Sequence, residues 1–98
     1  MRLMNWERNE IVRTARQYFG ERSKVILFGS RVRDDARGGD IDLLIIPNEK
    51  MDHLYEKKLR FRTTLKGAIG DQKIDVVLAG HEDERTIVKQ ALISGEEL

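Results

Sequence analysis

Two aspartates stand at the start of an apolar segment near the middle of the chain, where Asp40-Ile41-Asp42 is followed by the apolar residues 43–46. Aspartate is disfavoured in strands, so two of them at the start of a predicted strand indicate a functional requirement. Because side chains alternate along a strand, Asp40 and Asp42 share one face and lie about 6–7 Å apart along the backbone. Their carboxylates can therefore converge on one cation or a pair of cations, and oxygen ligands suit Mg²⁺ or Mn²⁺ rather than zinc.

A glycine-serine turn precedes the two aspartates. Residues 25–28 are apolar and predict a buried strand, which runs into Gly29-Ser30-Arg31. Gly29 allows the backbone to approach a ligand closely, and the free N–H groups at the start of a helical turn attract phosphate. A phosphate-binding turn beside a metal-binding pair of carboxylates indicates nucleotide chemistry.

A third aspartate lies inside another predicted strand, in the segment Ile74-Asp75-Val76-Val77-Leu78. An unpaired carboxylate is costly to bury, so Asp75 is either part of a structural salt bridge or a member of the site. With the other two aspartates present, we favour a metal ligand or a general base.

These residues together resemble the signature of the DNA polymerase beta-like nucleotidyltransferase superfamily. At this length the chain is similar to its minimal nucleotidyltransferases, the antitoxin-type (MntA-like) halves of two-gene modules with a HEPN protein. One departure is visible, because nine residues separate Ser30 from Asp40 where minimal members usually have ten. Turns tolerate such a deletion, so we expect the site to be retained.

The resemblance implies a role for each of these residues. Asp40 and Asp42 would hold two divalent ions, Mg²⁺ or alternatively Mn²⁺, and Asp75 would complete the second metal site or accept a proton. Gly29 and Ser30 would hold the β- and γ-phosphates of ATP. Arg31 is expected to neutralise phosphate charge, and Arg33 is open between that role and a solvated loop position.

The implied reaction is transfer of AMP from ATP to a hydroxyl of a partner protein, a HEPN-type toxin that the modification neutralises. Larger superfamily members add a helical acceptor domain, which this chain is not expected to contain. Two alternatives stay open: a non-catalytic binding antitoxin, and a nucleotidyltransferase acting on a small molecule or on RNA. The presence of all three carboxylates argues against the first alternative. The lack of an acceptor domain and the balanced charge argue against the second.

Length and composition set the remaining expectations. The 98 residues predict a single domain over 1–98, and 18 Lys and Arg nearly balance 17 Asp and Glu, which disfavours nucleic acid as a partner. There is no cysteine and no apolar run of membrane-spanning length, so we expect a cytoplasmic protein without membrane attachment. Assembly with a second copy of the chain is left open.

Apolar periodicity predicts helices over residues 5–19, from between 48 and 52 to 69, and over 82–94, with strands over 24–28, 40–46 and 73–78. Asn5 is expected to cap the first helix, and Ile87, Val88, Ala91 and Leu92 to form the inner face of the third. The fold class is α/β (α+β), and the resemblance implies a nucleotidyltransferase fold with a mixed three-stranded sheet of order 1-2-3. Such a sheet has two edges to protect, which is one reason to expect a protein partner.

Overall fold

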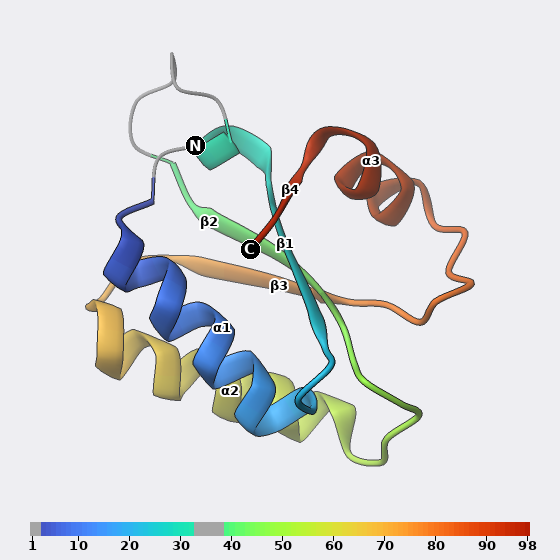
Figure 1. Ribbon diagram of the computed structural model, residues 1–98, viewed down its shortest axis with the longest axis horizontal. Helices are drawn as coiled ribbons and strands as arrows, with labels where there is room; N and C mark the ends of the chain where they lie inside the picture. Colours follow the sequence, from blue (N-terminus) through green and yellow to red (C-terminus); the bar gives the residue numbers. More distant parts are fainter. Residues whose placement is uncertain (1–2, 33–38) are drawn as a thin grey trace.

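The computed structural model describes residues 3–32 and 39–98, so Arg33 lies outside the described residues. Figure 1 shows helices and strands alternating along the chain. The elements are α1 (Asn5–Phe19), β1 (Lys24–Phe28), the 3₁₀ turn η1 (Gly29–Val32), β2 (Ile41–Ile46), α2 (Leu54–Ile69), β3 (Ile74–Leu78), α3 (Thr86–Ser94) and β4 (Glu96–Glu97).

The strands form one mixed sheet of order β3-β2-β1-β4. β1 pairs antiparallel with β2, and β2 pairs parallel with β3, so the predicted α/β class and the order of the first three strands are confirmed. The prediction of only three strands is wrong, because β4 adds antiparallel to the outer edge of β1. Two glutamates carry little strand propensity, and this pairing depends instead on contacts with β1 that no local pattern reveals.

The helices cover both faces of the sheet. In Figure 1 the sheet lies between the α1–α2 pair at the lower left and α3 at the upper right. On the α1–α2 side the core includes Phe19 and Phe61, whose ring centroids are 5.6 Å apart, packed on alternate residues of β1, β2 and β3. On the other side Val88 and Ala91 of α3 pack on the remaining alternate residues, among them Leu44.

The helix starts differ from the predicted ones for local reasons. α1 begins at Asn5 with Met4 at the N-cap, where the Glu7 carboxylate accepts a hydrogen bond from the Met4 N–H at 3.0 Å, so Asn5 is not the cap. α2 begins at Leu54, later than expected, because His53 adopts a left-handed conformation with φ 58°.

α3 also begins later than predicted and buries less of its surface. Asp83 accepts a hydrogen bond from the Arg85 N–H at 3.0 Å, which holds the preceding residues in a loop until Thr86. Val88 and Ala91 are buried, as expected, but Ile87 and Leu92 are 44% and 50% exposed. The predicted four-residue inner face is therefore too wide, since Ile87 and Leu92 flank the line of contact with the sheet.

Among the described residues, no helix combines the length and the apolar character needed to cross a membrane.

Candidate active site

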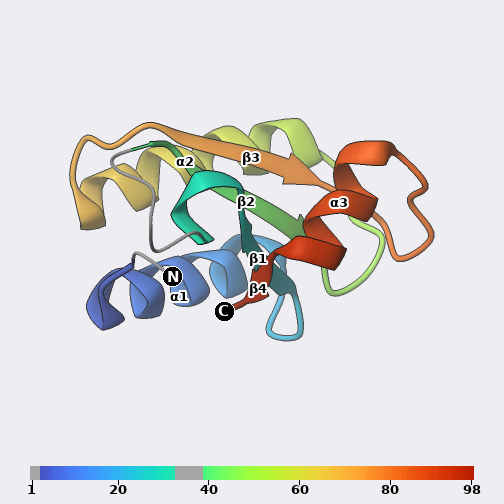
Figure 2. The same cartoon turned by 90° about the horizontal axis from the view of Figure 1, so that it is seen from above.

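The strand registers bring the predicted site residues to one end of the sheet. Phe28, the last residue of β1, is opposite Asp42 of β2, and Asp42 is opposite Asp75 of β3. Because Leu43 belongs to the core under α1 and α2, alternation places Asp42 and Asp75 on the opposite face, which carries α3. Asp40 lies just before β2, and η1 lies next to β2 in Figure 2.

The carboxylates of Asp42 and Asp75 interact directly. The pKa of Asp42 is raised above its ordinary value, first by burial, then by the negative charges of Asp75 and Asp40, and by a side-chain hydrogen bond with Asp75. A proton on Asp42 relieves this repulsion, and a divalent cation at the same place would relieve it more effectively. Carboxylate oxygens are the ligands that Mg²⁺ prefers, and here their negative charges lie close together. The residues therefore fit such an ion.

Asp40 has a different environment. Its Oδ2 lies 3.5 Å from the ammonium Nζ of Lys73, the residue just before β3, and the side chains of Lys73 and Asp40 are 70% and 41% exposed. The backbone N–H of Ile41 donates to the Lys73 carbonyl at 3.0 Å, which fixes the two strand starts side by side. Within residues 3–32 and 39–98, no group of three or more acidic, histidine or cysteine side chains is gathered closely enough to hold one metal ion.

Gly29 is in direct contact with Asp42. Its φ is +75°, and a Cβ added there would lie 2.3 Å from the Oδ2 of Asp42. Sequence reasoning expected this glycine to admit a ligand, and the structure shows that it also admits the carboxylate of Asp42. Any side chain at this position would displace that carboxylate.

The remaining predicted residues, Ser30 and Arg31, lie in η1 and are partly buried. Arg31 donates from Nη2 to the Gln72 side-chain oxygen at 2.9 Å and from Nε to the Gly39 carbonyl at 3.4 Å. The structure therefore places Arg31 where η1 meets the residues that precede β2 and β3.

Three residues near the site were missed by the sequence analysis. Lys73 pairs with Asp40, and Glu7 and Gln72 extend the contacts of Arg31 towards α1. Glu7 stands three residues after the N-cap, at the glutamate position of a capping box. Because Met4 stands where a capping box usually has Ser or Thr, the sequence did not carry this signal. No local pattern marks Gln72 or Lys73.

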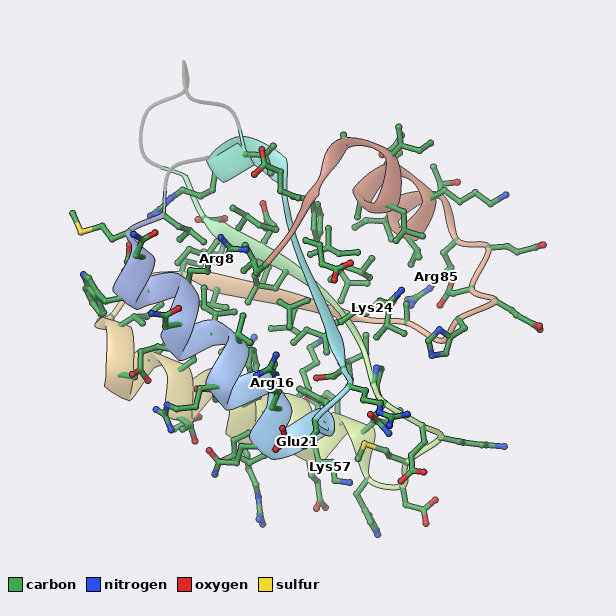
Figure 3. The ribbon with its side chains drawn as sticks, viewed as in Figure 1. Arg8, Arg16, Glu21, Lys24, Lys57 and Arg85 are labelled. Atoms are coloured by element: carbon green, nitrogen blue, oxygen red, sulfur yellow. The ribbon has the colours of Figure 1, made fainter. Side chains whose placement is uncertain are left out.

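A groove of about 640 Å³ lies elsewhere, along α1. Figure 3 labels Arg8 and Arg16 on this helix and Glu21 beyond its end. Both arginines are exposed, and none of the three aspartates lines the groove. Its lining consists of Arg8, Asn9, Val12, Arg13, Arg16, Gln17, Glu21 and Leu98.

A family model described as "Polymerase beta, Nucleotidyltransferase" matches residues 9–98, and the chain belongs to this family of nucleotidyltransferases. The predicted superfamily is thereby confirmed. No curated protein sequence matches the chain.

Solved structures agree with the family assignment. A crystal structure of a mutant of the toxin-antitoxin MntA-HpeT superposes with a TM-score of 0.70 and 22% identity, covering 98% of this chain and 72% of that one. A second mutant of the same toxin-antitoxin gives a TM-score of 0.63 and 20% identity, with 91% and 69% covered. At this level of identity the likeness is one of fold.

Proposed function

We propose that this protein transfers AMP from ATP to a hydroxyl group of a partner protein, a HEPN-type toxin that the modification neutralises. The observation that carries the proposal is the Asp42–Asp75 pair, with Asp42 packed against Gly29, in a polymerase beta nucleotidyltransferase fold. The acceptor is proposed because the solved structures with this fold come from a toxin-antitoxin.

Asp40, Asp42 and Asp75 are the proposed ligands of two Mg²⁺ ions, with Mn²⁺ as an alternative. When bound, such ions neutralise triphosphate charge and lower the pKa of an acceptor hydroxyl. Asp40 now pairs with the ammonium of Lys73, so it must leave that partner in order to bind a metal ion. The exposure of both side chains makes that exchange inexpensive, since exposed ion pairs contribute little.

Residues 29–31 are proposed to bind and orient the nucleotide. Gly29 and Ser30 are proposed to hold the β- and γ-phosphates, and Arg31 to neutralise part of their charge. The acceptor oxygen attacks the α-phosphorus, the bond from that phosphorus to the bridging oxygen of the β-phosphate breaks, and pyrophosphate leaves. The hydroxyl proton passes to the carboxylate of Asp75, and AMP remains ester-linked to the partner.

The test uses the purified protein, Mg²⁺ and ATP labelled at the α-phosphate, offered to a lysate of its own host. One labelled protein band is expected. The band should be lost with Asp42→Asn or EDTA and kept with Asp52→Asn, whose exposed carboxylate lies in the loop between β2 and α2. ATP labelled at the γ-phosphate should not label this band, which separates nucleotidyl transfer from phosphorylation.

Other outcomes would replace the proposal. Label in RNA or in small molecules would exclude a protein acceptor. A Mg²⁺-dependent ATP complex without any transfer would indicate a binding antitoxin.

A further inference from the structure

A line of hydrogen bonds joins the first turn of α1 to η1 through residues that the proposed reaction does not use. The Glu7 carboxylate accepts from the Gln72 Nε2 at 2.9 Å, and the Gln72 Oε1 accepts from Arg31 at 2.9 Å. Arg31 in turn donates to the carbonyl of Gly39. We propose that Glu7 and Gln72 are positioning residues, which hold Arg31 and the backbone before Asp40 in the arrangement that binds the nucleotide.

The carboxylate of Glu7 is unusually buried for a charged group. It is only 8% exposed, and a buried charge is unfavourable unless each oxygen is hydrogen-bonded. One oxygen accepts from the Met4 N–H and closes the start of the helix. That cap needs a single oxygen, and the other one contacts Gln72, which is 65 residues away in sequence. Glu7 also precedes residues 9–98, which the family model matches.

The side-chain amide of Gln72 lies between a hydrogen-bond acceptor, Glu7, and a hydrogen-bond donor, Arg31. An ionised carboxylate only accepts hydrogen bonds and a guanidinium only donates them. The amide therefore has one orientation, with its nitrogen towards Glu7 and its oxygen towards Arg31. Its nitrogen also donates to the carbonyl of Ile69 at 3.1 Å, at the end of α2. These bonds fix the side chain of Gln72 and, through it, the guanidinium of Arg31.

The far end of the line lies at the acidic residues. Gly39 precedes Asp40, and Gln72 precedes Lys73, whose ammonium pairs with Asp40. Disturbing Gln72 therefore acts from two sides on Asp40, through Arg31 and Gly39 and through Lys73. The loss of residues that orient a binding group lowers affinity or activity by about 10–100-fold in metal sites.

The first test is the dissociation constant of Mg²⁺–ATP for the full chain, by titration calorimetry, and it rests on the proposed function. Gln72→Leu is expected to weaken binding about tenfold, at the lower end of that range. In an Arg31→Met background the same substitution should have a clearly smaller effect, because the group it orients is gone and only the route through Lys73 remains. Glu7→Gln should weaken binding as well, since one end of its amide must face a donor. Gln90→Leu, on the exposed side of α3, is the matched control and should bind as the wild type does.

A purely structural role gives a different result. Equal effects of Gln72→Leu in both backgrounds, or no effect in either, would overturn the inference.

The second test needs no ligand and separates this inference from the proposed function. Backbone amide hydrogen exchange at Ile41, which donates to Lys73, should accelerate in Gln72→Leu and in Glu7→Gln, while Val88 in α3 stays unchanged. If the wild type binds no Mg²⁺–ATP, the proposed function fails and this exchange decides the inference alone. Local acceleration at Ile41 then sustains the inference that Glu7 and Gln72 position the backbone before Asp40, and unchanged exchange overturns it.

Discussion

At Asp42 the electrostatics of the site oppose the stability of the fold. The pKa of this carboxyl is raised by burial and by the charges of Asp75 and Asp40, so its ionised form is disfavoured in the folded protein. A proton bound more tightly in the folded state than in the unfolded chain makes stability fall as pH rises through the interval between the two pKa values. That interval begins near the ordinary value of 3.8 and ends at the raised value.

Asp42→Asn should therefore stabilise the metal-free protein at neutral pH, by a few degrees in the midpoint of thermal unfolding. The asparagine has no charge to repel and can still donate a hydrogen bond to Asp75. Thermal unfolding in EDTA across a pH series provides the measurement. The advantage of the variant should shrink as the pH falls through the interval and vanish below 3.8, where the wild-type carboxyl is protonated in both states. An advantage that is independent of pH would contradict this explanation.

Gly29→Ala should abolish nucleotidyl transfer and lower the free energy of unfolding by about 1–2 kcal/mol or more. The left-handed φ disfavours any side chain, and the new Cβ would displace the Asp42 carboxylate. Transfer activity and urea denaturation check the two parts. Gly67→Ala is the matched control, because Gly67 lies within α2 with no atom within 4 Å of its added Cβ. Alanine should stabilise the fold there by about 0.5–1 kcal/mol.

At the scale of elements, β4 depends on a close approach at Gly95. A Cβ on Gly95 would lie 2.6 Å from Cγ2 of Ile26 and 2.7 Å from the carbonyl oxygen of Leu27, both in β1. The strand can reach β1 only because this side chain is missing. Beyond β4, the N–H of Leu98 donates to the Val25 carbonyl at 2.9 Å and extends the pairing.

Gly95→Ala should thus detach β4 and destabilise the protein by about 1–3 kcal/mol, the usual cost of overpacking a tight contact. Urea denaturation gives the free energy of unfolding, and amide exchange at Leu98 reports the pairing directly. Gly80→Ala is the control, since the added Cβ meets nothing within 4 Å. If both variants unfold at the same urea concentration, the proposed tightness at Gly95 is not a determinant of stability.

At the scale of the whole molecule, a ligand that binds only the folded chain stabilises all of it. Mg²⁺–ATP at one hundred times its dissociation constant contributes about 2.7 kcal/mol. For a domain of this size the thermal midpoint should rise by about 10 °C or more. Compared with the wild type, Asp42→Asn should have the higher thermal midpoint in EDTA and the smaller increase in midpoint on addition of Mg²⁺–ATP. A full response in that variant would remove Asp42 from the metal site.

The sequence was sufficient for much of the fold because the relevant signals are local. Apolar periodicity located the helices and the first three strands. β2 and β3 begin one residue later than predicted, and the starts of α2 and α3 shifted further. The two helix shifts came from His53 in a left-handed conformation and from the hydrogen bond between Asp83 and Arg85. Neither feature belongs to a hydrophobic pattern, so periodicity could not predict it.

Taken alone, the sequence predicted that Asp40 and Asp42 share a face, and it located the helical turn that begins at Gly29, because both depend on a few neighbouring residues. Only the tertiary structure decided that Asp75 lies opposite Asp42, that Lys73 pairs with Asp40, and that β4 completes the sheet. The line from Glu7 through Gln72 to Arg31 was decided in the same way. These contacts join residues far apart in the chain, and they depend on strand register and packing between elements, which local spacing does not encode.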